Sequence, residues 1–299
     1  MNRWTFVSRM FIHLRVCIAV GVLGSVSPAL AAPAVGISLG VFPGTVDNSI
    51  PLQELIERYQ PLARYMETAL PGTQVRIQVI RSPSAFKAAV KKQSHQVLFV
   101  NPEIAAAAFE SGYRFRVARE DAIVGVVLVN AGSTIKDIRG LAGKTIMANR
   151  EAMVTTLVRA HLADSAVAVK WSFNNVPQQD LPKVATMGFA VDGLVVRREF
   201  FASLQKSSPN KWRIVAESPP EHGFMFGFRA DFPLASAKAL TAAFTALNPT
   251  AHAAVLSGFD SGKIVPSRYV AIDDFALAPM RDKLRKLSQV DGAANLVSK

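Results

Sequence analysis

The stretch from Gln96 to Gly112 constrains the fold more than any other part of the chain. Val97–Val100 is a short apolar run with β-branched and aromatic members, which is typical of a strand buried on both faces of a parallel sheet. Asn101 can cap a helix, Pro102 suits its first position, and the alanine-rich segment that follows predicts a helix ending at Gly112. In open α/β sheets, ligands and especially anions bind at such a strand-to-helix junction. An ordinary junction inside an α/β core is the alternative.

The same alternation of strands and helices continues along the chain and predicts the α/β class, with mostly parallel sheets flanked by helices. The predicted strands are 35–42, 75–80, 97–100, 122–129, 145–148, 168–173, 191–196, 212–216 and 224–228. The predicted helices are 52–70, 82–92, 104–111, 135–141, 154–163, 179–187 and 233–247. We expect short helices and loops from there to Lys299.

Residues 1–31 have the pattern of a cleaved secretory signal peptide. Three arginines form a positive n-region, and residues 16–26 form an apolar segment that is short for a membrane span. Ala29-Leu30-Ala31 is a small-x-small motif, so we expect cleavage after Ala31, with Ala32 as the alternative site. The signal predicts export to the periplasm of a Gram-negative cell, and an uncleaved anchor is the competing interpretation.

The composition of the mature chain excludes several classes of function. The whole chain has 34 basic and 22 acidic residues, and the signal peptide removes three arginines and no acidic residue, which leaves a net charge of +9. The only cysteine, Cys17, lies in the signal peptide, so disulfides, thiolate chemistry and cysteine-bound metals are excluded. The positive charge favours an anionic ligand, while the scattered basic residues and the export signal argue against nucleic acid.

No motif indicates catalysis or a cofactor. Gly143-Lys144-Thr145 lacks the upstream glycine of a phosphate-binding loop, and the four histidines of the mature chain show no metal-ligand spacing. Nucleophile and base motifs are absent as well. We therefore expect a binding protein without catalytic residues, bound metal or cofactor.

Five segments resemble motifs that occur in one protein family in the same order. Residues 58–66 resemble RYxPLAxYL, 96–102 resemble VDLAFLGP, 135–144 resemble IKSLEDLKGK, 188–195 resemble GEVDAAAV, and 259–281 resemble the closing GF-VP…DYDPVR. The family is that of the phosphate/phosphite/phosphonate-type periplasmic substrate-binding proteins of ABC transporters.

The resemblance implies a type II periplasmic binding protein fold with two α/β lobes. Lobe one would contain residues 33–121 and 223–299, and lobe two would contain 125–217. The crossings between them would lie near 122–127 and 218–224. The ligand would sit in the cleft and draw the lobes together by hinge closure.

The chain departs from the family at positions that bind the oxyanion. The family's Ser-Thr-Ser-Gly run corresponds to Met153-Val154-Thr155-Thr156, its Tyr after Gly-Pro to Ile104, its Ser-His pair to Gln178-Gln179, and one Asp to Gln96. A tetrahedral oxyanion needs several converging donors. These departures argue against a simple phosphonate, and the apolar Met153 and Val154 favour an organic ligand.

The candidate ligand-binding residues follow from these motifs and from their places at strand ends. They are Phe42, Asn101, Glu103, Arg150, Thr155, Thr156, Asn175, Gln178 and Gln179. The guanidinium of Arg150 could replace lost hydroxyl donors, or it could be a solvated loop side chain paired with Glu151. Asn175 could donate to the ligand or, with Asn174, form a turn.

The resemblance implies a protein that captures a small anion, an oxyanion or an organic acid, and presents it to an ABC permease in the inner membrane. The alternative is a ligand sensor that partners the periplasmic domain of a membrane sensor kinase. We expect a monomer in either role.

Overall fold

The structure is a computed structural model that describes residues 35–44, 50–187, 190–257 and 268–297. All of these residues belong to one compact unit, Ala34–Lys299. The predicted signal peptide, and parts of the motif segments 188–195 and 259–281, lie outside the described residues. None of the described helices is both long and apolar enough to span a bilayer.

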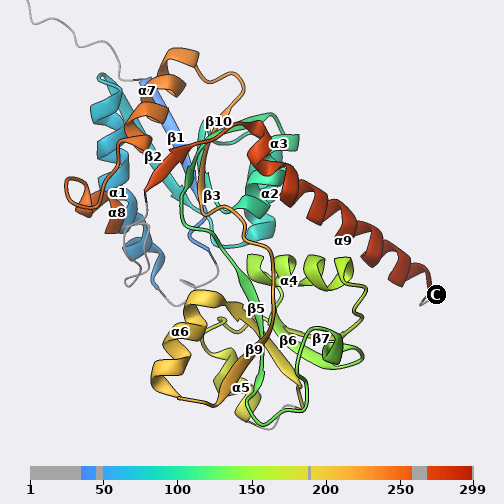
Figure 1. Ribbon diagram of the computed structural model, residues 1–299. Coiled ribbons are helices and arrows are strands. Elements are labelled where there is room, and N and C mark those ends of the chain that lie inside the picture. Colours follow the sequence, from blue (N-terminus) through green and yellow to red (C-terminus); the bar gives the residue numbers. More distant parts are fainter. Residues whose placement is uncertain (1–34, 45–49, 188–189, 258–267, 298–299) are drawn as a thin grey trace, which may run out of the picture. The chain divides into compact units, whose positions relative to one another are not determined.

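The first sheet has six strands in the order β11-β4-β10-β3-β1-β2 (Figure 1). Strands β1, β2 and β3 pair in parallel, whereas β10 runs antiparallel between β3 and β4, and β11 pairs antiparallel with β4. The bounds are β1 (Val35–Val41), β2 (Thr73–Val79), β3 (Val97–Val100), β4 (Tyr113–Arg119), β10 (Met225–Arg229) and β11 (Tyr269–Ala271).

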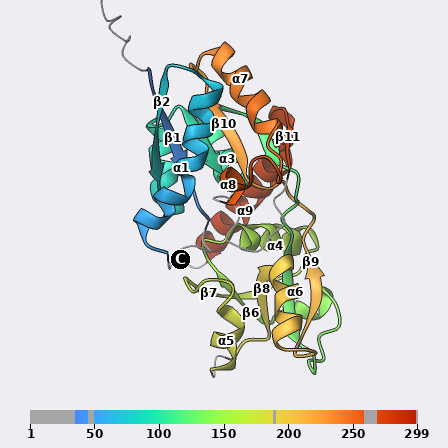
Figure 2. The same cartoon turned by 90° about the vertical axis from the view of Figure 1, so that its left-hand side faces the viewer.

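Helices cover both faces of the first sheet, as the fully buried strand β3 requires (Figure 2). Val97 and Phe99 face a core shared with α1 (Leu52–Ala69), α7 (Leu234–Thr245) and α8 (Ala253–Ser257). Leu98 and Val100 face the opposite core, which contains α2 (Pro83–Lys91) and α3 (Pro102–Glu110). Successive side chains of a strand point to opposite faces, which explains why an unbroken apolar run suits this position.

The second sheet has five strands in the order β7-β6-β8-β5-β9. Strand β6 pairs in parallel with β7 and β8, and β5 pairs antiparallel with β8 and β9. Helix α4 packs on one face, and α5 and α6 pack on the other. The bounds are β5 (Gly125–Asn130), β6 (Thr145–Asn149), α4 (Met153–Asp164), β7 (Lys170–Asn174), α5 (Leu181–Thr186), β8 (Gly193–Arg197), α6 (Arg198–Ser207) and β9 (Trp212–Glu217).

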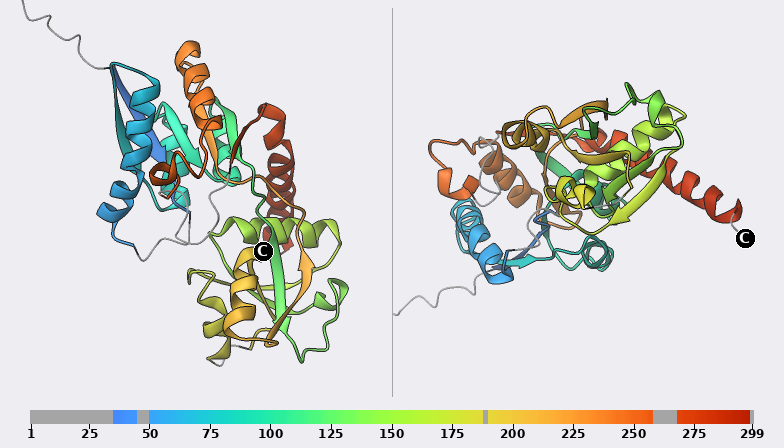
Figure 3. Two further views of the ribbon diagram at one scale, coloured as in Figure 1. Left: turned by 60° about the vertical axis from the view of Figure 1, so that its left-hand side comes forward. Right: turned by 90° about the horizontal axis from the view of Figure 1, so that it is seen from below.

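Two segments, 120–124 and 218–224, connect the sheets and pair with each other (Figure 3). The backbone nitrogen of Ile123 donates to the oxygen of Glu221 at 2.6 Å, and the nitrogen of Glu221 donates to the oxygen of Ile123 at 3.0 Å. The strand that follows each crossing, β5 or β10, enters its sheet antiparallel to its neighbours. The α/β class with flanking helices is therefore confirmed, but both sheets are mixed and not mostly parallel as predicted. The predicted lobe boundaries stay a prediction.

Three local predictions differ from the structure. Only the 3₁₀ turn η1 (Arg139–Leu141) forms within the helix predicted at 135–141, because Asp137 Oδ1 accepts from the nitrogen of Gly140 at 3.1 Å and competes with helical bonding. The strand predicted from residue 122 begins at Gly125, since the residues before it belong to the crossing. The prediction also missed β4, β11 and α6.

The prediction of short helices and loops at the C-terminus is wrong. After the 3₁₀ turn η2 (Asp274–Leu277), helix α9 extends over Ala278–Val297. Its residues Met280, Leu284 and Leu287 follow helical spacing and are buried or partly buried, the first two in the same core as α4. Lys286 Nζ lies 2.7 Å from Asp164 Oδ1 on α4. Packing against α4 therefore stabilises α9 at a length that local propensity did not predict.

Candidate functional site

A small cavity of about 60 Å³ lies where both crossing segments meet the N-termini of α3 and α4. Its residues come from both sheets and from the connections between them. They are Gly44, Asn101, Ile123, Ala152, Met153, Val154, Gln178, Arg197 and Phe224. The fold therefore brings together two predicted site residues, Asn101 and Gln178, that are distant in sequence.

The start of α3 contributes Asn101, which is buried. Its Oδ1 accepts a hydrogen bond from the backbone nitrogen of Ile104 at 2.9 Å, which confirms the predicted helix cap. Pro102 occupies the first helical position and has no N–H to offer. The side-chain nitrogen of Asn101 is the donor that the cap does not use.

Glu103 and Thr156 contact each other instead of lining the cavity. Thr156 Oγ1 donates to Glu103 Oε2 at 3.1 Å, and Lys87 Nζ donates to Glu103 Oε1 at 2.8 Å. The Glu103 side chain thus joins α2, α3 and α4. Both predicted candidates lie beside the cavity, with their polar groups directed at other side chains.

The start of α4 has no side-chain cap, because Ala152 stands at the capping position. Met153 and Val154 line the cavity at this end, where the first backbone N–H groups of a helix have no intrahelical partners and the helix dipole favours an anion. Thr155 is buried, and its hydroxyl donates to the backbone oxygen of Asn149 at 2.7 Å. Its hydroxyl is therefore engaged by the protein.

Among the described residues that line the cavity, Arg197 is the charged one, and the sequence prediction missed it. It ends β8, and its backbone nitrogen donates to Gln178 Oε1 at 2.9 Å. Its Nε lies 2.8 Å from Glu199 Oε2 and its Nη2 lies 3.6 Å from Asp121 Oδ2, with a side chain that is 20% exposed. Asp121 also accepts two hydrogen bonds from Arg119, at 2.8 and 2.9 Å.

A signal for Arg197 was present in the sequence. A cationic residue directly follows the apolar residues 194–196 of a predicted strand, and β8 runs parallel to β6, which leads to α4. The carboxyl ends of parallel strands meet at one edge of the sheet. Recognising Arg197 required knowing that these two strands are neighbours.

Arg150, the cation that the sequence suggested, lies outside the cavity lining. It is exposed, and its Cζ lies 4.8 Å from the centroid of the Phe173 ring. Asn175 is also exposed, and Asn174 Oδ1 accepts from the nitrogen of Val176 at 3.1 Å, which is a turn of the kind proposed as the alternative. These side chains are not brought to the cavity.

The last two candidates are placed differently. Phe42 is buried in the core of the first sheet, with its ring 6.1 Å from that of Phe86 between centroids. Gln179 is half-buried, and its Oε1 is enclosed without a hydrogen-bond partner in the part of the chain that the structure describes. Neither residue lines the cavity.

The cavity combines one guanidinium, two side-chain amides and the open N-terminus of α4 with the apolar side chains of Ile123, Met153, Val154 and Phe224. Such a set can hold a small anion that has an apolar part. The described residues that line the cavity include no nucleophile or general base. Among the described residues, no group of three His, Cys, Asp or Glu side chains is arranged to hold a metal ion.

A family model described as "ABC transporter, phosphonate, periplasmic substrate-binding protein" matches residues 49–271, which is more than half of the chain. No curated protein sequence matches this chain. Similar solved structures include a binding protein component of an ABC phosphonate transporter from Pseudomonas aeruginosa, with 15% identity, coverage of 87% of this chain and 89% of that one, and a TM-score of 0.62.

Two further structures have a similar fold. One is PhnD1 from Prochlorococcus marinus in complex with methylphosphonate, with 14% identity, coverage of 86% of this chain and 99% of that one, and a TM-score of 0.64. The other is a Xanthomonas citri protein bound to ATP, with 13% identity, coverage of 85% and 98%, and a TM-score of 0.70. The match of the family model over residues 49–271 shows that the chain belongs to the phosphonate-type periplasmic substrate-binding proteins of ABC transporters.

Proposed function

We propose that this protein captures a small organic anion in the cavity between its two sheets and presents it to an ABC permease. Arg197 is the observation that carries this proposal, because it places a cation in a cavity whose other described lining residues are neutral. Members of the family are periplasmic substrate-binding components of transporters rather than enzymes.

The contacts of Arg197 leave it able to bind a ligand. The 3.6 Å separation from Asp121 is longer than a hydrogen bond, and Asp121 is already held by Arg119. The other contact is a close ion pair with Glu199 and not a hydrogen bond, since Arg197 Nε and Glu199 Oε2 are both buried without a hydrogen-bond partner among the described residues. A carboxylate, phosphonate or sulfonate could therefore take one side of the guanidinium, with the N-terminus of α4 adding favourable dipole interactions.

The size of the cavity favours a ligand with few heavy atoms. One water needs about 10–15 Å³ of such space, so about 60 Å³ suits a ligand of the size of methylphosphonate better than a nucleotide. The solved relatives include a methylphosphonate complex and an ATP complex, so the fold alone does not select between them. The apolar lining favours an alkyl-substituted anion over inorganic phosphate.

The two paired crossings support delivery by hinge closure. In the proposed mechanism the segments 120–124 and 218–224 form the hinge between lobes 33–121 plus 223–299 and 125–217. The closed form would be read by the permease. No contact within the described residues favours the sensor-kinase alternative. Genes for a permease and an ATPase beside this one would support transport, and genes for a kinase and a regulator would support sensing.

Isothermal titration of the mature chain, residues 32–299, tests the ligand class. The panel contains methylphosphonate, methanesulfonate, propionate and inorganic phosphate. We expect at least one alkyl anion to bind more tightly than phosphate, and Arg197→Gln to weaken that binding while Arg150→Gln leaves it unchanged. If Arg150→Gln removes binding and Arg197→Gln does not, the site has been placed at the wrong arginine.

A further inference from the structure

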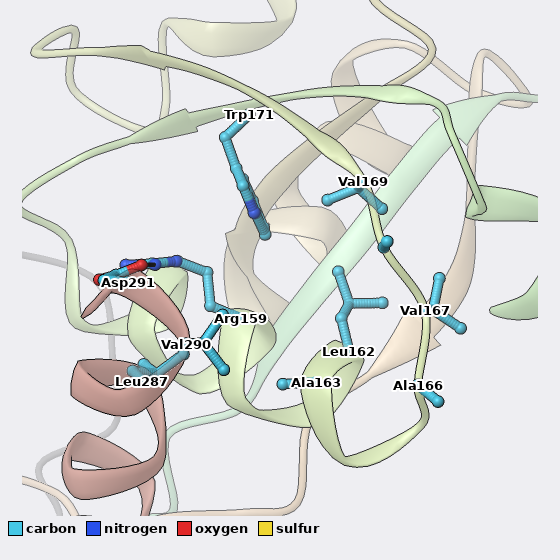
Figure 4. A pocket seen from close by; sticks show the side chains of 11 residues that line it. Arg159, Leu162, Ala163, Ala166, Val167, Val169, Trp171, Leu287, Val290 and Asp291 are labelled. Carbon is cyan, nitrogen blue, oxygen red and sulfur yellow. Dashed lines mark hydrogen bonds and ion pairs between the residues drawn. The ribbon is translucent and has the colours of Figure 1, made fainter. Parts of the chain in front are cut away.

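A second and larger hollow of about 510 Å³ lies between α4, α9 and the segment that leads into β7 (Figure 4). It shares no lining residue with the cavity at Arg197. Its volume is in the range of small-molecule sites, which is about 300–1,000 Å³. We call it the α4–α9 groove.

The walls of the α4–α9 groove are almost entirely apolar. All described lining residues except Arg159 and Asp291 have apolar side chains, with Leu162 from α4, Val167 and Val169 from the connecting segment, and Leu287 from α9. Trp171 lies along one side in the close view, and its ring stacks on Phe173 with 5.6 Å between centroids and 4° between planes. An aromatic wall opposite aliphatic side chains suits a flat, apolar group.

An ion pair between Arg159 and Asp291 lies at the edge of the groove. Arg159 Nη2 lies 2.5 Å from Asp291 Oδ1, and Arg159 Cζ lies 5.7 Å from the centroid of Phe173. The Arg159 side chain is 22% exposed, whereas that of Asp291 is 55% exposed. The arginine is therefore held by the protein, while the carboxylate partner is on the solvent side.

This asymmetry identifies the charge of a suitable ligand. Breaking a half-exposed ion pair costs little, because the released carboxylate is hydrated by water. A partly buried arginine that has no paired anion is less stable than one that has. An incoming acidic group would therefore take the place of Asp291 beside the guanidinium of Arg159.

We propose that the α4–α9 groove is a second ligand site, which takes a small aromatic molecule with one acidic group. The ring lies against Trp171 and Leu162, and the acid pairs with Arg159. The site is independent of the ligand proposed for the first cavity, since no lining residue is common to both.

The probe for this site is 8-anilinonaphthalene-1-sulfonate, an aromatic anion whose fluorescence rises in apolar surroundings. The mature chain has two tryptophans, Trp171 and Trp212, so the variant Trp212→Phe leaves Trp171 as the only energy donor. We expect saturable binding at one site with energy transfer from Trp171. Arg159→Gln should weaken binding at least tenfold, and Asp291→Asn should strengthen it, because Arg159 then loses its competing carboxylate.

A filling variant separates this groove from other apolar surface. Ala163 is exposed on the groove side of α4, so Ala163→Phe should block the probe without disturbing a core. Ala202→Phe, at an exposed position of α6, is the matched control and should leave binding unchanged. Arg197→Gln should also leave it unchanged, which separates this result from the first cavity.

Two results would overturn the proposal. One is probe binding that does not saturate, or that Ala163→Phe and Ala202→Phe affect equally. The other is Asp291→Asn weakening the probe as much as Arg159→Gln does, since that would mean that the ion pair acts only on the stability of α9. Thermal unfolding of each variant shows that the fold is retained before binding is compared.

Discussion

The two helix starts at the first cavity are built in different ways. Both follow a buried strand, α3 after β3 and α4 after β6. The side chain of Asn101 caps α3, with 2.9 Å between its Oδ1 and the nitrogen of Ile104, whereas Ala152 gives α4 no side-chain cap. The start of α3 is thus capped by a side chain. In α4 the nitrogen of Thr155 donates to the backbone oxygen of Ala152 at 2.9 Å, and the N–H groups of Met153 and Val154 have no partner among the described residues.

The difference indicates which side of the cavity receives the charge of the ligand. Arg197 ends β8, next to β6 and therefore near the start of α4. The cation of Arg197 and the uncapped end of α4 both follow strands of the second sheet. The start of α3, in contrast, provides the neutral amide of Asn101. We therefore expect the acidic group of the ligand to bind at the α4 side, and the α3 side to select the ligand by its shape.

The largest expected effect comes from removing the cation on the α4 side. Arg197→Gln should weaken binding of the best alkyl anion about 10- to 100-fold, because a hydrogen bond to a charged group contributes about 1.5–3 kcal/mol. Arg197→Lys should recover part of the affinity, since the charge remains but the fork of donors is lost. Titration calorimetry measures both. If Arg197→Gln and the wild type bind the anion with equal affinity, the acidic group of the ligand does not bind at the α4 side.

A smaller effect is expected on the α3 side, and it concerns stability. Asn101→Ala removes the helix cap and should lower the free energy of unfolding by about 1 kcal/mol. Asn101→Ser keeps a capping oxygen and should recover most of that loss. Urea unfolding gives the values. A loss in Asn101→Ala that Asn101→Ser does not recover would show that the cap is not the cause.

Giving α4 the cap that it lacks should have an effect of opposite sign. Ala152→Ser should raise the free energy of unfolding by about 0.5–1 kcal/mol, because a serine oxygen accepts from the first turn. The same oxygen competes with the ligand, so affinity should fall by a few-fold. Greater stability with unchanged affinity would mean that the N–H groups of α4 do not contact the ligand.

The smallest effect near neutral pH concerns the buried His95, which precedes β3 and thus the α3 side. Burial lowers the pKa of His95 from its usual 6.5, and neither ring nitrogen has a hydrogen-bond partner among the described residues. Phe86 and Gly40 pack against the ring, and the hydroxyl of Tyr113 donates to the His95 backbone oxygen at 2.7 Å. Burial raises the pKa of Tyr113, and the charges of Arg229 and Asp231, which pair with each other, act on it in opposite directions.

The sign of the pH effect follows from this lowered pKa. Below about pH 6.5 the unfolded chain takes up a proton at His95 that the folded chain does not, so stability falls as the pH drops from there towards the lowered pKa. His95→Leu should flatten this dependence in urea unfolding between pH 7.5 and 5. In hydrogen exchange, the backbone amides of α3 should lose their protection at a higher pH than those of α4 as the pH is lowered. Equal slopes for the variant and the wild type would contradict this assignment.

Local signals explain which parts of the site could be predicted. The capping oxygen of Asn101, Pro102 after it and the apolar run before it lie within a few residues, and the structure confirms this junction. The stripe of Met280, Leu284 and Leu287 was equally readable, but the prediction did not follow it into a long helix. Secondary structure depends on near neighbours, so periodicity and capping indicate much of it.

The roles of the polar side chains depended on distant partners. Arg150 and Arg197 both follow apolar strands, yet one lies over the ring of Phe173 and the other lines the cavity. The hydroxyls of Thr155 and Thr156 are engaged by Asn149 and Glu103. The spacing of these residues does not indicate which of their polar groups form contacts within the protein.

The sequence by itself determined the α/β class, the strand-to-helix junction at Asn101 and the motifs of the family, because these depend on local pattern. Only the tertiary structure decided that β10 and β5 enter their sheets antiparallel, that segments 120–124 and 218–224 pair, and that Arg197 faces the cavity. The reason is physical: which strand ends share an edge is set by pairing between residues far apart in the chain, and only that pairing places their side chains around one cavity.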